Sequence, residues 1–274
     1  MQNEYLSTGF TDVDRTRNRN AYFDCLRLLD SLPYYQEYKT KSYDLLDLKP
    51  GMTILEAGCG LGDDAFRMAG RIMPGGKVIG LDASEAMIAK AKLNANAALL
   101  PVQFLVGDVK ALPFPDGSIA RCRIDRVLQH IPQPEQAIAE LFRVLEPGGL
   151  LLAYDNDWEA FSIASSASNI TPVIERLWRD SFVNSAIGRH LPGHFMTAGL
   201  SDIKIYPSTS VITDFETADK VYNLQETAQK AMAAGFFSEA EGHRWIKDCI
   251  EQSAKGHFKT ALTAYTVIGK KEVS

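Results

Sequence analysis

The chain has 274 residues, of which 46% are hydrophobic and 23% are charged, and its formal net charge is −5. This composition excludes the disordered and fibrous classes, and the length suffices for one large domain, or one domain with a cap, around a sizeable core. The mildly acidic charge and the lack of a dense basic run argue against nucleic acid as a partner.

The sequence predicts neither a membrane segment nor a disulfide framework. The amino-terminal segment is polar, without the apolar run of a signal peptide or an anchor, and no later window is long and apolar enough for a membrane span. Cys25, Cys59, Cys122 and Cys249 stand far apart with no C-x-x-C pair, which argues against disulfides and a zinc knuckle. We therefore expect a cytoplasmic protein without a membrane partner or a bound metal.

Residues 45–155 alternate short β-branched runs with helical stretches, which is typical of a parallel sheet with helices on both faces. The predicted strands cover residues 52–58, 77–82, 102–108, 121–128 and 150–155. Helices are expected between them over 63–73, 84–98 and 134–145, and Ser84 is the predicted N-cap of the second helix. The pattern therefore predicts an α/β fold with a Rossmann-like sheet.

Helical segments flank this core on both sides. A tyrosine-rich helical region over about residues 21–46, broken at Leu32-Pro33, is expected to pack over the carboxyl edge of the sheet as a lid. The elements predicted after the core are helix over 170–199, a strand over 201–213, helix over 215–256 and a strand over 260–271. The last two strands should pair antiparallel, with a helical cap inserted between them. The chain then divides into a lid (1–46), a core (47–156) and a cap with the closing hairpin (157–274).

A glycine-rich turn follows the first strand and opens a helix, in the segment Glu56-Ala57-Gly58-Cys59-Gly60-Leu61-Gly62. Glycines there allow backbone angles closed to other residues and let a ligand approach the main chain. Asp82 ends the second strand, where a carboxylate can accept ribose hydroxyls, and Asp108 ends the third, where it can meet an adenine amino group. Ligands of open α/β sheets bind beyond the carboxyl ends of the strands, so these features predict a nucleoside pocket.

The residues after the turn favour one class of nucleoside cofactor. A dinucleotide needs an uncluttered helix start, usually with glycine at the position that Asp63 occupies here, and Asp64 follows it. Two carboxylates at that place repel a diphosphate but not a sulfonium cation with an amino-acid tail. This favours S-adenosylmethionine over NAD or FAD.

Four segments then follow one another in a recognisable order. They are ILEAGCGLG (54–62), VIGLDASEAMI (78–88), FLVGDVKALPFPDGS (104–118) and VLQHIPQPEQAIAELFRVLEPGGLLL (127–152). Together they resemble the class I S-adenosylmethionine-dependent methyltransferases, in particular the branch related to menaquinone and ubiquinone biosynthesis enzymes. The resemblance covers roughly residues 40–155 and implies a mostly parallel seven-stranded sheet that ends in an antiparallel hairpin. It also implies S-adenosylmethionine as cofactor and S-adenosylhomocysteine as product.

By position, the resemblance implies a set of cofactor-binding residues. In that set, Glu56 and the turn glycines line the methionine and ribose moieties, Asp82 holds the ribose, and Ala83 and Met87 flank the adenine, whose edge meets Asp108 and Val109. Arg126 and Gln129 lie near the sulfonium. The full set is Glu56, Gly58, Cys59, Gly60, Gly62, Asp82, Ala83, Met87, Gly107, Asp108, Val109, Arg126 and Gln129. The pair Arg126-Val127 and the insertion at 215–256 depart from the family pattern on the substrate side.

Methyl transfer from a sulfonium has an excellent leaving group, so a dedicated catalytic residue is optional. A base adds about 10²–10⁴-fold where the acceptor is a hydroxyl, an acidic carbon or an ammonium. The candidate bases are His130, Asp155 and Asp157, with His190 and His194 as further candidates later in the chain. Each has a structural alternative, because His130 could hydrogen-bond the backbone of the following loop and the two aspartates could cap a turn.

Other side chains are candidates for the acceptor side or the lid. They are Tyr35, Tyr38, Tyr43, Trp158, His190 and His194. The tyrosines could form an aromatic wall over the sulfonium or half-bury against the sheet, and Trp158 could stack on an acceptor or belong to the core. The two histidines are four residues apart, but Pro192 lies between them and no acidic third ligand has suitable spacing, so we predict no metal site.

The sequence thus predicts a methyltransferase that binds its cofactor in residues 54–130 and a small-molecule acceptor beneath a cap made from 10–46 and 157–256. The enclosed cap favours a medium-sized, partly apolar acceptor, such as a quinone precursor or a secondary metabolite. Two alternatives stay open: a non-methylating enzyme with the same fold and cofactor, and a non-catalytic protein that binds S-adenosylmethionine. We expect a monomer or a homodimer.

Overall fold

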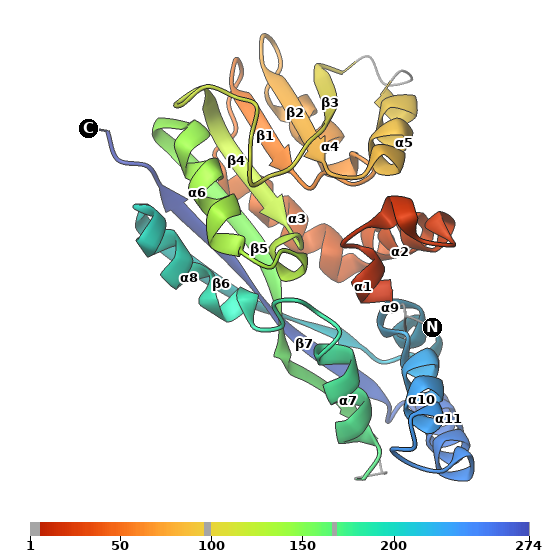
Figure 1. Ribbon diagram of the computed structural model, residues 1–274. Coiled ribbons are helices and arrows are strands. Elements are labelled where there is room, and N and C mark those ends of the chain that lie inside the picture. Colours follow the sequence, from red (N-terminus) through yellow and green to blue (C-terminus); the bar gives the residue numbers. More distant parts are fainter. Residues whose placement is uncertain (1–5, 96–99, 166–168, 274) are drawn as a thin grey trace.

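The strands form one mixed sheet in the order β3-β2-β1-β4-β5-β7-β6 (Figure 1). In this computed structural model, which describes residues 6–95, 100–165 and 169–273, β1 to β5 pair in parallel and β7 runs antiparallel to both β5 and β6. The strands are β1 (Thr53–Ala57), β2 (Lys77–Asp82), β3 (Val102–Val106), β4 (Ile119–Asp125), β5 (Leu145–Ala164), β6 (Ser201–Ile212) and β7 (Lys259–Lys270). The predicted Rossmann-like, seven-stranded sheet with its terminal antiparallel strands is confirmed.

Helices cover both faces of the sheet. The α-helices of the core and lid are α1 (Leu6–Gly9), α2 (Arg19–Ser31), α3 (Pro33–Leu45), α4 (Asp63–Arg71), α5 (Glu85–Ala95) and α6 (Pro134–Val144), with short 3₁₀ helices η1 (Val13–Arg15) and η2 (Leu128–His130). Side chains from α4 and α5 pack with β1 and β2 in one buried cluster, whereas α6 and α8 (Ile187–Ala198) pack on the opposite face. The core is thus the three-layer arrangement that alternating strands and helices predict.

The lid helices break where the sequence places the break. Leu32 is extended (φ −78°, ψ 135°) and Pro33 starts α3, because proline is tolerated only in the first turn of a helix. The predicted N-cap of α5 is also present, since the hydroxyl of Ser84 accepts a hydrogen bond from the backbone N–H of Met87 at 3.1 Å.

Several strand boundaries differ from the prediction: β3 ends at Val106 rather than at 108, β4 begins at Ile119, β5 begins at Leu145, and the ends of β4 and β5 differ as well. The strand expected over 121–128 ends at Asp125, because Arg126 takes a left-handed backbone conformation (φ 55°) and turns the chain into η2. The strand expected over 150–155 runs on to Ala164, because its pairing with β7 continues past a bulge between Asp157 and Ser162. β5 therefore carries side chains from the core into the cap.

The cap consists of several short helices. The helix expected over 170–199 is two helices, α7 (Thr171–Arg179) and α8, and the segment 215–256 contains α9 (Phe215–Tyr222), α10 (Leu224–Ala233) and α11 (Glu239–Ala254). Asn223 separates α9 from α10 with a left-handed conformation (φ 47°), and Ser238 starts α11 with a capping box to Glu241.

One aromatic cluster joins the lid to the cap. Tyr35 and Tyr38 of α3 share it with Trp158 of β5, Phe215 of α9 and Trp245 of α11. Figure 1 shows the lid helices between the core and the cap helices, which lie at the far end of the long strands β5 to β7. The lid and the cap therefore form a common core, and together they enclose the carboxyl ends of the strands.

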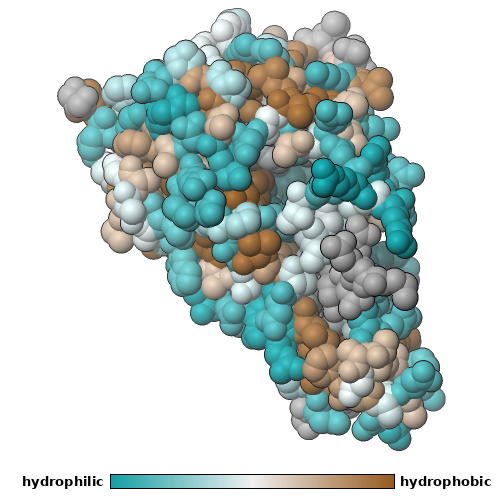
Figure 2. All heavy atoms as spheres, viewed as in Figure 1, coloured by the Kyte–Doolittle hydropathy of each residue, from teal (hydrophilic) through white to brown (hydrophobic). Residues whose placement is uncertain are grey.

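Hydrophobic side chains on the surface in view are dispersed rather than gathered in one band (Figure 2). On the face that Figure 2 shows, hydrophobic side chains form separate patches over both the core and the cap, with hydrophilic side chains between them. Among the described residues, no helix combines the length and the apolar character needed to cross a membrane.

Candidate active site

A cavity of about 800 Å³ lies at the carboxyl ends of the strands, between the core, the lid and the cap. Its volume falls in the upper part of the range for small-molecule sites. All of the predicted cofactor residues except Gly62 line it. The sheet therefore brings the glycine turn and both strand-end aspartates to one place, as the sequence predicted.

The glycine turn is held by β2 and needs its glycines. The backbone N–H groups of Gly58 and Cys59 donate to the carbonyl of Leu81 at 2.7 and 3.0 Å. Gly58 has φ 71°, and a Cβ there would lie 2.1 Å from the side chain of Val127. Gly62 has φ 85°, and a Cβ there would meet the ring of Phe104 at 2.5 Å. Gly62 thus serves the packing of the turn rather than the lining of the cavity.

Asp82 lies at the end of β2 and lines the cavity. Its two carboxylate oxygens accept hydrogen bonds from the backbone N–H groups of Gly60 (2.8 Å) and Ser84 (2.9 Å). Burial raises the pKa of Asp82, and these backbone donors oppose that shift. Asp108, after β3, is more open: its side chain is 55% exposed and accepts from the backbone N–H of Lys110 at 2.9 Å.

The lid closes over this end of the cavity through Asp14 of η1. The carboxylate of Asp14 accepts from the hydroxyl of Ser84 (2.9 Å) and from the backbone N–H groups of Glu85 (2.8 Å) and Ala86 (3.1 Å). These groups form the amino terminus of α5, where unsatisfied N–H groups and the helix dipole favour a negative charge. A residue 70 positions earlier in the chain therefore caps the helix beside the predicted adenine site.

The sequence reasoning missed Arg123, the buried centre of a charged network between the lid and the core. The guanidinium of Arg123 is fully buried and pairs with Glu56, Asp64 (3.2 Å) and Asp125 (2.6 Å), and it also donates to Ser42 (3.0 Å). The signal that could have revealed it is an arginine in the middle of a strand whose neighbours are all buried.

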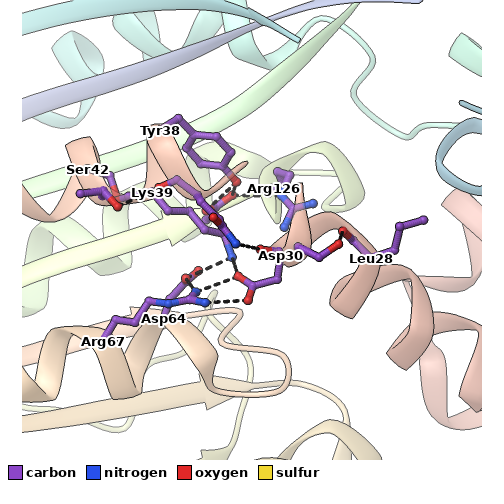
Figure 3. A network of polar contacts seen from close by, with 12 residues as sticks. Leu28, Asp30, Tyr38, Lys39, Ser42, Asp64, Arg67 and Arg126 are labelled. Atoms are coloured by element: carbon purple, nitrogen blue, oxygen red, sulfur yellow. Dashed lines mark hydrogen bonds and ion pairs between the residues drawn. The ribbon is translucent and has the colours of Figure 1, made fainter. Parts of the chain in front are cut away.

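The same network ties α2 and α3 to the core (Figure 3). Lys39 of α3 lies 3.1 Å from both Asp30 of α2 and Asp64 of α4, and Arg67 of α4 pairs with Asp30 at 2.6 Å. Because the side chains of Lys39 and Asp64 are nearly buried, these contacts are screened less than ion pairs at the surface. The network holds the lid against the cavity.

The pKa values of Glu56 and Asp64 are shifted in opposite directions in this network. Burial raises the pKa of Glu56 to about 8, with the nearby carboxylates adding to the rise and Arg123 opposing it. Burial also works to raise the pKa of Asp64, but Arg123 and Lys39 outweigh it and hold that pKa below its ordinary value. One oxygen of Glu56, Oε2, is buried with no hydrogen-bond partner among the described residues.

The turn after β4 orients Gln129 and His130. The Oε1 of Gln129 accepts from the indole N–H of Trp158 (2.9 Å) and from the side-chain amide of Asn156 (3.2 Å). Its Nε2 lies 3.0 Å from the Nε2 of His130, whose ring sits between the rings of Phe10 and Phe182 at 5.7 and 5.8 Å. Burial, with the charge of Arg126, lowers the pKa of His130 to about 3. These contacts do not fit a proton-accepting base.

Asp155 and Asp157 do not line the cavity, contrary to their prediction as candidate bases. Successive side chains of a strand point to opposite faces, so Asn156 and Trp158 of β5 line the cavity while the two aspartates point away from it. Asp155 accepts from the backbone N–H of Gln129 at 3.3 Å, and burial raises its pKa to about 8. Asp157 pairs with Arg189 of α8 at 2.6 Å.

His190 and His194 also lie outside the cavity lining, on α8, which packs against β5 and β7 on the other side of the sheet. Their proposed place in the lid is therefore wrong. In the ranges that the structure describes, no cluster of three or more His, Cys, Asp or Glu side chains is arranged to hold a metal ion.

Of the three candidate lid tyrosines, only Tyr35 lines the cavity. Tyr38 donates to the carboxylate of Asp125 (3.1 and 3.2 Å) and stacks on Tyr154 with 3.8 Å between ring centroids, and Tyr43 donates to Asp64 at 2.6 Å. The aromatic wall comes instead from several segments far apart in the chain. It contains Phe10, Tyr35, Trp158, Trp178, Phe182 and Tyr222.

Comparison with known proteins identifies the family. The sequence model described as a methyltransferase domain matches residues 48–229. An uncharacterized 37.1 kDa protein in transposon TN4556 of Streptomyces fradiae is 36% identical over 251 residues, which cover 91% of this chain and 70% of that protein. A demethylmenaquinone methyltransferase of Lactococcus lactis is 32% identical over 166 residues, covering 58% of this chain and 66% of that protein. The match thus spans slightly less than two thirds of that enzyme.

Solved structures agree in fold. The YcgJ protein of Bacillus subtilis superposes with a TM-score of 0.63 at 18% identity, over 87% of this chain and all of that one. The predicted cofactor, S-adenosylmethionine, is the cofactor of the family that these comparisons identify. The chain belongs to the methyltransferase domain family, as a class I S-adenosylmethionine-dependent methyltransferase related to the quinone-biosynthesis enzymes.

Proposed function

We propose that this protein transfers a methyl group from S-adenosylmethionine to a small, largely apolar acceptor. One observation carries the proposal: a single cavity joins the glycine turn and the strand-end carboxylates to a wall of aromatic side chains. The first part suits a nucleoside with a cationic tail, and the second suits an acceptor with a flat or apolar body.

The acidic part of the cavity fits the cofactor. The carboxyl side chains in the cavity lining are Asp12, Asp14, Asp30, Glu56, Asp63, Asp64, Asp82, Asp108 and Asp125. A cluster of negative charge favours a sulfonium and an ammonium and disfavours a diphosphate. We assign Asp82 to the ribose, Glu56 to the cationic amino-acid tail, and Ala83, Met87, Asp108 and Val109 to the adenine. When bound, the cofactor supplies an electrophilic methyl group on a sulfonium.

The residues of the chain would act by position and by exclusion of water. Phe10, Trp158 and Phe182 cover the turn after β4, with Trp158 and Phe182 stacked at 4.1 Å between ring centroids. His130 keeps its place beside them as a neutral ring. Aligned and desolvated reactants can supply on the order of 7–11 kcal/mol of the barrier, so the displacement does not require a base.

We propose that the acceptor is a quinone precursor or a secondary metabolite. The curated methyltransferase relatives are named for demethylmenaquinone, but the match covers only part of their length, and the cap at 215–256 departs from the family pattern. We also propose a reducing, cytoplasmic setting, supported by four free, buried cysteines.

We propose that the chain has three functional regions: a lid (1–46), a core (47–156) and a cap (157–274). The lid retains the cofactor, and the cap encloses the acceptor. β5 crosses the last boundary, so the cap moves with the sheet rather than as an independent domain. Exchange of the acceptor would then depend on the lid.

The proposal is tested by calorimetric titration with S-adenosylmethionine, S-adenosylhomocysteine and NAD. We expect micromolar binding of the two adenosyl compounds and none of NAD. Asp82→Ala should weaken adenosyl binding at least tenfold, whereas Asp24→Ala, on the exposed face of α2, should leave it unchanged. Equal affinity of the two variants would remove the ribose assignment, and no adenosyl binding by the wild type would remove the proposed function.

A non-methylating use of the same cofactor is the competing function. Labelled methyl groups decide between the two, because only a methyltransferase moves the label from S-adenosylmethionine into the acceptor and releases S-adenosylhomocysteine in equal amount. Conversion of an acceptor with the label still on the cofactor would contradict methyl transfer.

A further inference from the structure

Arg126 is a cation in the cavity wall that the proposed reaction does not yet use. It follows β4 directly and adopts φ 55°, a conformation that is costly for a residue with a side chain and is kept mainly at functional sites. Its guanidinium lines the cavity, and 15% of its side chain is exposed.

The guanidinium of Arg126 is only partly satisfied. Its Nε donates to Oδ1 of Asp125 at 3.2 Å, and its plane lies over the ring of Tyr35 at 5.1 Å. Within the described part of the chain, its two terminal nitrogens donate no hydrogen bond. Arginine carries five N–H donors in a planar fork that matches a carboxylate or another anionic oxygen.

Asp125 cannot neutralise the charge of Arg126 by itself, because its carboxylate also interacts with two other side chains. Its Oδ2 is paired with Arg123 at 2.6 Å, and the hydroxyl of Tyr38 donates to both of its oxygens. The other cationic side chains among the described lining residues have closer or dedicated partners: Lys39 lies between two carboxylates at 3.1 Å, and Lys110 is 3.6 Å from Asp108. Among the described cationic side chains that line the cavity, Arg126 is therefore the one whose charge is incompletely paired.

A second donor lies on the same turn. The indole of Trp158 can only donate, so it fixes Oε1 of Gln129 as the acceptor and Nε2 of Gln129 as the donor toward Nε2 of His130. The proton of the neutral imidazole must then be on Nδ1. Nδ1 is buried and has no hydrogen-bond partner among the described residues. A buried donor without a partner costs free energy, so this turn is held in place at a cost.

We propose that the acceptor carries an anionic oxygen, a carboxylate or an ionised acidic hydroxyl, which pairs with the guanidinium of Arg126 and is held against the aromatic wall. This rests on the proposed function, since it assigns the acceptor to the aromatic part of the cavity. A protonated amine would meet a like charge at Arg126, so the site selects against it. A neutral alcohol would leave the charge of Arg126 unpaired.

Matched aromatic probes test the proposal by binding rather than by turnover. The probes are 2-naphthoate, 2-naphthol, 2-naphthylmethanol and 2-naphthylmethylamine, titrated calorimetrically into protein saturated with S-adenosylhomocysteine. We expect 2-naphthoate to bind at least tenfold more tightly than 2-naphthylmethanol, and the amine to bind most weakly. Arg126→Gln should remove the preference for the anion and leave the affinity for the neutral alcohol within about twofold. The surface variant Arg27→Gln should keep the wild-type order.

The two sources of the anionic oxygen give different results. If an acidic hydroxyl is the natural group, bound 2-naphthol shows the absorption of the naphtholate at a pH below its ordinary ionisation, and Arg126→Gln abolishes that band. If a carboxylate is the natural group, only 2-naphthoate gains affinity from Arg126. Either result supports the anionic acceptor.

The remaining outcomes overturn the proposal. Equal affinity for the acid and the alcohol contradicts it, as does an acid preference that survives in a folded Arg126→Gln protein. If that variant does not fold, Arg126→Lys decides: it keeps the charge without the fork, so it should retain the order of affinities at reduced strength, and loss of the order refutes the pairing. Failure of the wild type to bind S-adenosylhomocysteine would instead refute the proposed function, so the two failures are distinct.

Discussion

The two parts of the cavity are built in different ways. The acidic part uses neighbouring residues at the ends of β1, β2 and β3, so short runs of sequence supply most of its wall. The aromatic part takes one or two residues each from α1–η1, α3, β5, α7 and α9 and the loops beside them. A site for a ligand common to a family can thus be a local motif, whereas the site for a specific acceptor depends on how distant segments pack.

The two parts also differ in what holds them. Backbone hydrogen bonds fix the glycine turn and Asp82, whereas ring packing and the turn of Gln129 and His130 fix the aromatic wall. The network around Arg123 lies between them and is the element on which both depend.

Removal of Arg123 should have the largest effect, because both parts of the cavity rest on it. Arg123→Leu leaves Glu56, Asp64 and Asp125 without their shared cation, and loss of one partner of a buried ion pair costs about 3–5 kcal/mol. Urea unfolding should show this loss of stability, and Arg27→Leu at the surface should show almost none. A loss below about 1 kcal/mol, as for a surface pair, would contradict a central role.

Release of the lid at Asp14 should weaken retention of the cofactor in the acidic part of the cavity. Asp14→Ala removes the carboxylate that accepts from Ser84 and from the first backbone N–H groups of α5, and it should lower the free energy of unfolding by about 1–2 kcal/mol. Because the lid then opens more often, stopped-flow displacement should show S-adenosylhomocysteine leaving several times faster. Asp24→Ala is the matched control on α2. An unchanged dissociation rate would show that η1 does not retain the cofactor.

A change at Asp155 should have an effect on stability that depends on pH. Because burial raises the pKa of Asp155 to about 8, the folded state binds more protons than the unfolded state between about pH 4 and 8. Its contribution to stability is therefore complete at low pH and is lost as the pH rises. Asp155→Asn should remove that loss, so the variant gains on the wild type by up to about 1.4 kcal/mol per pH unit.

Urea unfolding of both proteins at several pH values from 5 to 8 measures this difference. Asp24→Asn, at an exposed site, should run parallel to the wild type. Parallel curves for Asp155→Asn would show that Asp155 is ionised in the folded protein, and its place in the support of the η2 turn would have to be reconsidered.

Much of the fold could be predicted from the sequence, because it depends on periodicity and on local chemistry. The run 77–82 is β2 as predicted, Ser84 caps α5, and Pro33 separates α2 from α3. The lining of the acidic part was also predictable, since the ends of parallel strands meet at one edge. Gly62 is the exception. Glycine is required there because a Cβ would collide with the ring of Phe104, not because a ligand approaches it.

The errors share a physical cause. Asp155 and Asp157 follow a predicted strand end, but antiparallel pairing with β7, more than a hundred residues later, extends β5 and fixes which face each side chain takes. His190 and His194 lie on a helix whose side of the sheet no local pattern reveals. Arg123 was missed because an arginine in a strand has meaning only once its three carboxylates are known.

The sequence by itself determined the α/β sheet, the glycine turn, the strand-end carboxylates and hence the class of cofactor, because each arises from residues close together in the chain. Only the tertiary structure decided the wall of the acceptor site, the partners of Arg123 and Arg126, and the tautomer of His130. Those features depend on burial and on contacts between distant segments, and it is burial that makes an ionic or polar contact strong enough to select a ligand.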